Sequence, residues 1–586
     1  MMLVTLAIAP PSSRHLDVPP DTIIELDREF VNGSRIELDS LTAVQLENLV
    51  VLAKVWGFLK YHHPRVTSGA VQWDFELFRV LSSVLAASDA SERNAALLGW
   101  IEQLRDVPQC DPCASPPSDA HLLPPIAWIR DEQLLGVELS RALQHVWANR
   151  PTGQQFWVRI PFPGAGNVNL SREPAYADLE HVDAGYRILA AFRLWNVIEY
   201  WFPYRDQIEE DWDGVLRELL PVFVEARTHA DYERALVLLI ARVHDTHANI
   251  WSGLDSRPPS GTCALPATLR FLDRQVVVAG VRRRPTTELR MGDVLLALDG
   301  RPIDELIEEW RPYYAASNEP TRLRDIASVL SLGECGRCSA VIDRAGQRLE
   351  LELRRVAGAG HHEGLPTHDR RGDTFQWLGD QVAYLKLSTV YAEDVRGYIE
   401  EAADARGLVI DIRNYPNEFV VFALGQHLVE TPTPFARFTM PDLANPGAFT
   451  WTESLHLFPQ APHYDGKVAI LIDEVSQSQA EYTSMAFRAA PDAVVIGSTT
   501  AGADGNVSEF ALPGGERTWI SGIGIFYPDK RPTQLIGIVP DITVIPTREG
   551  IRDRRDELLE RALREILGPD IPEAEIHELA RPPRRE

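Results

Sequence analysis

Long apolar runs are missing from this sequence, and so is any excess of positive charge. No stretch approaches the ~18 apolar residues that a membrane-spanning helix needs, so we expect no transmembrane segment. Lysine and arginine number 58 against 84 aspartate and glutamate residues, which gives a formal net charge of −26. Because this charge repels nucleic acid and anionic membrane surfaces, we do not expect nucleic acid as a partner.

Cysteine is also scarce, with five residues in the chain. Four form two CxxC pairs, Cys110 with Cys113 and Cys335 with Cys338, and Cys263 stands alone. Two such pairs can share a zinc ion, but they lie far apart in the sequence, so local disulfides in an exported protein, or free thiols in a cytosolic one, are favoured. The first nine residues are apolar and are either the remnant of a signal peptide or a plain terminus. The compartment stays open, with export favoured over the cytoplasm.

The 586 residues are too many for one hydrophobic core, and a hydrophobic content of 45% can fill several cores. The N-terminal part contains an internal repeat, because a pattern of aromatic residues recurs at a constant offset of 139 positions. The matched positions are Trp56, Tyr61, Pro64, Trp73, Asp74, Leu77 and Leu81 in one copy and Trp195, Tyr200, Pro203, Trp212, Asp213, Leu216 and Leu220 in the other. Each copy predicts a helical hairpin that packs its aromatic side chains into a shared core.

The hydrophobic pattern becomes strand-like from about residue 265. The run 293–303 contains an apolar strand, an Asp-Gly turn and the start of a helix, which favours a PDZ-like domain over an unrelated small β barrel. Such domains bind an extended peptide, often its C-terminal end, as an added strand. The last third alternates strands with helices, which predicts an α/β sheet whose site lies at the carboxyl ends of its strands.

We therefore predict a multidomain α+β protein whose oligomeric state stays open. The expected parts are an N-terminal extension (1–40), two helical regions with one repeat copy each (41–175 and 176–260), a PDZ-like domain (261–358), an α/β core (373–570) and a C-terminal tail (571–586).

One serine in the α/β core lies where a nucleophile would be expected. The predicted strand 467–473 runs into Ser478, after which a helix begins. A serine at such a strand-to-helix turn is exposed and lies next to free N–H groups that can hold an oxyanion. Taken alone, the pattern favours a helix N-cap, with Glu481 completing a capping box.

Over about residues 180 to 550 the sequence resembles the tail-specific and tricorn-type serine peptidases. The matching motifs are Asp411-Ile412-Arg413, Ser478-Gln479-Ala480-Glu481, Gly497-Ser498-Thr499-Thr500-Ala501-Gly502 and Gly537-Ile538-Val539-Pro540-Asp541. The resemblance implies a catalytic core of the ClpP/crotonase-like type and cleavage of peptide bonds through an acyl-enzyme on Ser478. It also implies protein or peptide C-terminal regions as substrates, and neither a metal ion nor a cofactor.

Two departures from the family pattern refine the expected mechanism. The lysine of the Ser-Lys enzymes is replaced by Ala503, which excludes that dyad. The tricorn-like branch uses a histidine after a hydroxyl residue, so His247 is the expected base, Thr246 its support, and His244 the less favoured alternative. The glutamate of that branch corresponds to Gln534, a neutral amide that can orient the imidazole without supplying charge.

The resemblance also implies an oxyanion site. The backbone N–H of Gln479 follows the nucleophile directly, and Pro416 has no N–H, so Asn417 or Glu418 must supply the second donor. The segments after the serine motif are expected to shape the substrate pocket, although a plain turn role for the Asp-Gly pair is just as well supported. The expected pocket residues are Gly502, Asp504, Asn506 and Gly524.

Two other functions fit the same sequence. The missing lysine, the missing glycine pair of the family's oxyanion loop and the neutral Gln534 are compatible with a catalytically silent protein that binds peptides or ligands. An esterase-like hydrolase would keep the nucleophile and act on an easier bond.

Overall fold

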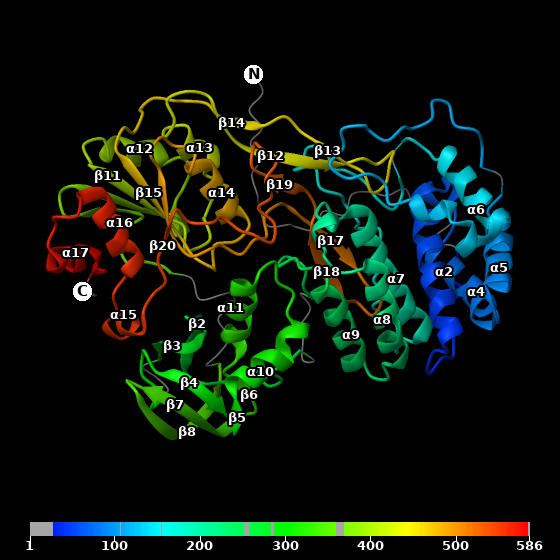
Figure 1. Cartoon of the computed structure of the whole chain (residues 1–586), viewed down its shortest axis with the longest axis horizontal. Helices are drawn as coiled ribbons and strands as arrows, with labels where there is room; N and C mark the ends of the chain where they lie inside the picture. Colours follow the sequence, from blue (N-terminus) through cyan, green and yellow to red (C-terminus); the bar gives the residue numbers. More distant parts are fainter. Residues whose placement is uncertain are drawn as a thin grey trace.

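The computed structural model describes residues 27–105, 107–153, 155–250, 257–282, 286–358 and 368–583. Figure 1 shows a helical N-terminal region, a small β domain and an α/β region that contains the C-terminal helices. Among these described residues, no helix is both long and apolar enough to cross a membrane.

The N-terminal region consists of two sets of helices that repeat the same contacts. Its helices are α2 (Ala43–His62), α3 (Pro64–Thr67), α4 (Trp73–Ala86), α5 (Ala90–Gln103), α6 (Glu132–Ala148), α7 (Ala184–Trp201), α8 (Trp212–Glu225) and α9 (His229–Ala241). The indole N–H groups of Trp56 and Trp73 each donate to the carbonyl oxygen of the other, at 3.4 and 3.1 Å. Trp195 and Trp212 exchange the same two bonds, at 2.8 and 3.2 Å. The division of this region into two domains stays a prediction.

A fully buried group of four charged side chains lies inside the helical region. Lys60 pairs with Glu173 at 2.6 Å, and Arg193 contacts Asp74 at 2.7 Å and Glu173 at 2.9 Å. Buried charges are tolerated only when paired in this way. Arg193 also donates to the carbonyl oxygen of Ala511, at 2.7 Å. The group therefore ties the helices to the hairpin of β17 (Val507–Ala511) and β18 (Arg517–Ser521), which Figure 1 shows beside α7 to α9.

The small β domain contains one sheet with the strand order β2-β3-β4-β7-β8-β1-β6, and β5 pairs with β4. Its strands are β1 (Cys263–Ala264), β2 (Ala267–Leu272), β3 (Gln275–Val281), β4 (Val294–Leu298), β5 (Arg301–Pro302), β6 (Leu332–Gly333), β7 (Gly336–Arg344) and β8 (Gln347–Ala357). Two helices, α10 (Ile303–Trp310) and α11 (Glu319–Val329), accompany the sheet. The strand, turn and helix expected at 293–303 are present, and the PDZ-like identity stays a prediction.

The cysteine pairing differs in part from the expected local pairs. Cys110 is bonded to Cys113, but Cys335 is bonded to Cys263 rather than to Cys338. Antiparallel pairing of β1 with β6 brings Cys263 and Cys335 to a Cα separation of 5.0 Å, which suits a disulfide. Cys338 is a free thiol buried in the core of this domain.

The α/β core has the sheet order β20-β16-β15-β11-β10-β9, in which only β9 runs antiparallel. Its strands are β9 (Phe375–Leu378), β10 (Val382–Lys386), β11 (Gly407–Asp411), β15 (Lys467–Ile472), β16 (Val494–Gly497) and β20 (Ile542–Thr543). The helices are α12 (Val395–Glu401), α13 (Val421–Gly425), α14 (Gln479–Phe487), α15 (Arg548–Asp553), α16 (Glu557–Leu567) and α17 (Glu573–Ala580). The predicted alternation of strands and helices is therefore present.

A second, smaller sheet joins the core to the helical region. It consists of β12 (Thr433–Pro441), β13 (Phe449–Trp451), β14 (Leu455–Leu457) and β19 (Gly524–Phe526). The segment expected to be a C-terminal tail instead contains α17, because Ile576 and Ala580 are apolar and pack into the core beside α16. β11 and β15 are parallel neighbours, so the loops after them meet at one edge of the sheet.

Candidate active site

Ser478 lies in a strained turn between β15 and α14. Its φ is 57° and its ψ is −118°, and a positive φ is uncommon and costly for a residue other than glycine. Such a turn presents the side chain at the carboxyl edge of the sheet, beside the free N–H groups of the following helix. This geometry suits a nucleophile.

The carboxylate of Glu481 holds this turn in place. It accepts hydrogen bonds from four donors, namely the N–H groups of Ser478 (3.1 Å), Gly502 (2.8 Å) and Ala503 (3.0 Å) and the hydroxyl of Thr500 (2.5 Å). The bond to Ser478 is the one that a capping box predicts, so the helix-capping role and the nucleophile role are compatible. Glu481 thus fixes the serine turn to the loop 500–503.

Asp504 forms a buried acidic pair with Glu481. Burial raises the pKa of both carboxyl groups, and the charge of Glu481 raises that of Asp504 further. Asp504 accepts one hydrogen bond, from the N–H of Gly505 at 2.8 Å, and its other oxygen has no partner in the described part of the chain. Since Glu481 accepts four hydrogen bonds, we assign the negative charge to Glu481 and the proton to Asp504.

His247 lies in the segment that follows α9. A bridge between Ile250 and Thr518 holds this segment against β18. The imidazole is buried, and its Nδ1 lies 2.9 Å from the hydroxyl oxygen of Ser521 and 3.7 Å from a carboxylate oxygen of Asp245. Burial lowers the pKa of His247, while the charge of Asp245 raises it, and the net shift is downward. His247 is therefore neutral at pH 7, as a general base must be.

Asp245 and Ser521, which contact His247, were not among the predicted site residues. Asp245 could have been noticed as an acidic residue two positions before the histidine. Ser521 comes from a strand 274 positions away, and no local pattern marks it.

Thr246 and Gln534 contact the surroundings of His247 rather than its ring. The Thr246 hydroxyl lies 3.1 Å from the Ser317 hydroxyl and accepts the Ser317 N–H at 2.9 Å. The Gln534 amide donates to Asp245 at 3.3 Å and to the Ser317 hydroxyl at 3.4 Å. The contact to the imidazole that was expected of Thr246 is made by Ser521 instead.

The backbone N–H of Gln479 directly follows Ser478 at the start of α14, and its role as an oxyanion donor stays a prediction. The prediction of Asn417 as the second donor is wrong for this conformation, because its N–H donates to the carbonyl oxygen of Leu387 at 2.9 Å. Among the described residues, the N–H of Glu418 has no such acceptor. The Tyr415 hydroxyl lies next to the Ser478 side chain and the Gln479 N–H, and the Tyr415 side chain as a whole is exposed. Tyr415 thus occupies the place next to the nucleophile.

The four expected pocket residues have different surroundings. Asp504 lies beside the serine turn, as described above. Gly502 has a φ of +69° and donates to Glu481, so it shapes the turn itself. Asn506 donates to Asn167 at 2.7 Å. Gly524 lies on β19, where a Cβ would come within 2.4 Å of the Thr439 hydroxyl, so close strand packing explains this glycine.

The small β domain contacts the loop that leads to Ser478. Arg270 on β2 pairs with Glu474 at 2.7 Å and with Asp473 at 2.9 Å. Arg324 on α11 donates to the carbonyl oxygen of Glu474 at 2.8 Å and to the side chain of Gln477 at 3.2 Å. Two arginines of the small domain therefore position the nucleophile loop.

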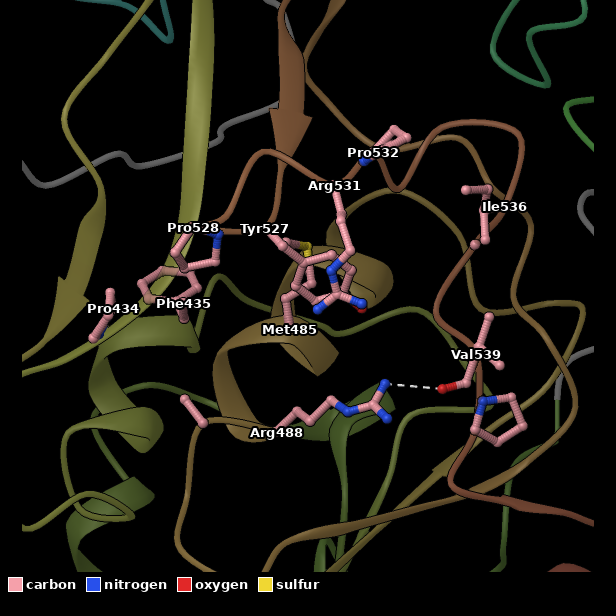
Figure 2. Close-up of a pocket in the computed structure, with 13 residues that line it drawn as sticks. Pro434, Phe435, Met485, Arg488, Tyr527, Pro528, Arg531, Pro532, Ile536 and Val539 are labelled. Atoms are coloured by element: carbon pink, nitrogen blue, oxygen red, sulfur yellow. Dashed lines mark hydrogen bonds between the residues drawn. The ribbon is translucent and has the colours of Figure 1, made fainter. Parts of the chain in front are cut away.

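A mainly apolar pocket lies at the other end of α14. Pro434, Phe435, Met485, Tyr527 and Ile536 are among the side chains that line it. In Figure 2 the guanidinium of Arg488, at the end of α14, donates to the carbonyl oxygen of Val539 at 2.9 Å. Helix α14 thus connects the serine turn with this pocket.

Comparisons with known proteins found one family match and several similar structures. Residues 431–544 match the model of Peptidase family S41. A search of curated proteins found no match. The crystal structure of mature CPAF is 15% identical with a TM-score of 0.51, and the match covers 66% of this chain and 99% of that chain. The structure of mature CPAF complexed with lactacystin is 14% identical with a TM-score of 0.50, and the match covers 63% of this chain and 96% of that chain. The photosystem II D1 C-terminal processing protease has 16% identity and a TM-score of 0.36, with 61% and 92% covered.

At 14–15% identity, the likeness to the two CPAF structures concerns the fold. The matched family segment contains the Ser478 turn, the loop 497–502 and the motif 537–541. The segment 431–544 therefore has the sequence of a family S41 peptidase, and the chain is a serine peptidase that acts on proteins or peptides.

Proposed function

We propose that the chain cleaves peptide bonds with Ser478 as nucleophile and His247 as general base. The observation that carries this proposal is the strained turn of Ser478 beside the N-terminus of α14. A second support is the buried, neutral imidazole of His247. The loop 500–506 connects the two, because Ala503 accepts the Ser478 N–H and Gly522, next to Ser521, donates to Asn506.

The reaction then has two halves. The Ser478 oxygen attacks the carbonyl carbon while its proton moves to Nε2 of His247, and the oxyanion is stabilised by the N–H groups of Gln479 and Glu418. The C–N bond breaks as His247 gives this proton to the leaving amine. A water molecule then loses a proton to His247 and attacks the acyl-enzyme, which releases a carboxylate and restores the Ser478 hydroxyl.

We further propose that the substrate is held near its C-terminal end by the small β domain. In the described sheet β2 is an edge strand with α11 beside it, an arrangement that suits strand addition by an extended peptide. Arg270 on β2 reaches the loop that leads to the nucleophile. The two disulfides support export to an oxidising compartment.

A fluorophosphonate probe tests the nucleophile and the base. We expect labelling of the wild type, no labelling of Ser478→Ala, and strongly reduced labelling of His247→Ala. If the folded wild type is not labelled, the catalytically silent binding function replaces this proposal. Turnover of esters without turnover of peptides would favour the esterase.

Paired peptides test the preference for C-terminal regions. Two substrates of one sequence, with a free carboxylate and with a C-terminal amide, are compared by kcat/KM. We expect the free carboxylate to be preferred, and equal values would contradict binding through the C-terminus.

A further inference from the structure

We infer that Asp245 supplies the negative charge that orients and stabilises His247, and that it acts through the hydroxyl of Ser521. This inference rests on the function proposed above. It makes Asp245 and Ser521 positioning residues, and it assigns to Asp245 the role that position 534 cannot fill with a neutral glutamine.

The hydrogen bonds around Asp245 determine which imidazole nitrogen carries the proton. The Ser521 hydroxyl donates to Asp245 at 3.0 Å and lies 2.9 Å from Nδ1 of His247. A hydroxyl has one proton, so once it donates to the carboxylate it must accept from Nδ1–H. Nε2 is then left without a proton and can accept the proton of the nucleophile.

The carboxylate of Asp245 is itself held firmly. Its two oxygens accept the backbone N–H of His247 at 3.1 Å and that of Ser521 at 2.7 Å, in addition to the Ser521 hydroxyl and the Gln534 amide. The side chain is fully buried. A carboxylate fixed by four donors cannot turn away from the imidazole that it supports.

The charge of Asp245 has no competing cation nearby. In the part of the chain that the structure describes, its one ion-pair partner within 4.0 Å is His247. Tyr204 also interacts electrostatically with Asp245, and burial raises the pKa of Tyr204 well above 10.0, so this phenol is neutral. Ser317, Ser521 and Gln534 complete the surroundings and carry no charge. The negative charge of Asp245 therefore interacts mainly with the imidazole of His247.

This arrangement also explains the neutral residue at position 534. The Gln534 amide lies 3.3 Å from the Asp245 carboxylate. A glutamate here would place two carboxylates in contact, and like charges at such a distance cannot both stay ionised. The site thus holds one negative charge, at position 245 instead of position 534.

The test moves the carboxylate from position 245 to position 534. Asp245→Asn is expected to reduce kcat on the order of 10²- to 10⁴-fold with little change in KM, since the imidazolium loses its charged partner. Because the charge of Asp245 raises the pKa of His247, the acid limb of the kcat/KM profile is expected to move to lower pH. The double variant Asp245→Asn/Gln534→Glu returns a carboxylate to the same cluster and is expected to recover at least about tenfold in kcat.

Two further variants complete the experiment. Ser521→Ala keeps the carboxylate and removes the bridge, so we expect a fall in kcat with a smaller shift of the acid limb; it also tests the inference if Asp245→Asn fails to fold. Asp404→Asn, an exposed carboxylate near the opposite end of β11, is the control and is expected to match the wild type.

Each outcome distinguishes this inference from the proposed function. If the folded wild type is neither labelled at Ser478 nor active, the proposed function fails. If the wild type is labelled and Asp245→Asn keeps the wild-type kcat and pH profile, only the inference fails. A double variant no better than the folded Asp245→Asn variant would also overturn it.

Discussion

The guanidinium of Arg324 donates to the carbonyl oxygen of Glu474 at 2.8 Å, which joins α11 of the small β domain to the loop in front of the nucleophile. This bond and the one to Gln477 restrain the four residues that precede Ser478. A displacement of the small domain would therefore also displace the serine turn.

Arg324→Met tests this contact. We predict that kcat falls about 10- to 100-fold, because a small displacement of the nucleophile is enough to cost this much. The rate of turnover of a short peptide measures it. The matched control is Arg337→Met, which replaces an exposed arginine of the same domain and is expected to keep the wild-type kcat. Equal losses in both variants would point to general damage to the domain.

The pH dependence of labelling reports the state of His247. Burial lowers its pKa below the usual 6.5, and a base must be unprotonated to act. We therefore predict that the labelling rate of Ser478 rises with pH through a midpoint below 6.5 and stays constant around neutral pH. Labelling rates of the wild type in buffers across this range measure the midpoint. A midpoint above 6.5 would contradict the buried, neutral imidazole.

Tyr415 lies beside Ser478, in the place where we expect the substrate to bind. Its hydroxyl interacts with the serine side chain and the Gln479 N–H. We predict that Tyr415→Phe is labelled about fivefold faster, the equivalent of one released hydrogen bond of ~1 kcal/mol. Tyr391→Phe, another exposed tyrosine of the core, serves as the control. Slower labelling of Tyr415→Phe would mean that the hydroxyl assists the reaction.

The buried charges of the helical region make a large contribution to stability. Arg193→Leu removes the closest ion-pair partner of Asp74, which keeps only Lys60 at 4.0 Å, and one of the two partners of Glu173. We predict a loss of about 3–5 kcal/mol in the free energy of unfolding, the usual cost of removing one partner from a buried ion-pair group, because two carboxylates then share the one cation of Lys60. Urea unfolding measures this loss. Arg217→Leu, which breaks the exposed pair with Glu47, is expected to cost less than about 1 kcal/mol.

The two disulfides differ in the length of chain that they close. Cys263 and Cys335 lie 72 positions apart, whereas Cys110 and Cys113 lie three apart. Replacing the first pair by serine is predicted to destabilise the chain by about 2–4 kcal/mol, and replacing the second pair to change it little, because the long loop restricts the unfolded chain more. Thermal unfolding of the two double variants compares them directly.

Sequence reasoning located the parts of the site that depend on local patterns. The turn at Ser478, the carboxylate of Glu481 and the histidine after α9 each have neighbours in the chain that identify them. Ser521 could not be found in this way, because its place depends on how β18 lies against the segment 244–250. Asn417 was assigned to the oxyanion site from sequence spacing, but its N–H is already bound to Leu387.

In the fold, too, features that depend on local patterns could be predicted, and features that depend on long-range contacts could not. The constant offset of the tryptophans was enough to predict two equivalent hairpins. The disulfide between Cys263 and Cys335 depends instead on the pairing of two very short strands, β1 and β6, which carry too few residues to give a hydrophobic period.

The hairpin of β17 and β18 is anchored in the N-terminal helices, through the bond from Arg193 to Ala511 and that from the Tyr232 hydroxyl to Pro513 at 2.7 Å. Since this hairpin carries Ser521, and His247 precedes the small domain, the segment 431–544 that matches the family contains the proposed nucleophile but not the proposed base. A recombinant fragment that begins after residue 260 would keep Ser478 and lose both His247 and the helices that anchor the strand of Ser521. The proposed function therefore requires the helical region in the smallest active piece, as the scaffold for the proposed base and its bridging hydroxyl.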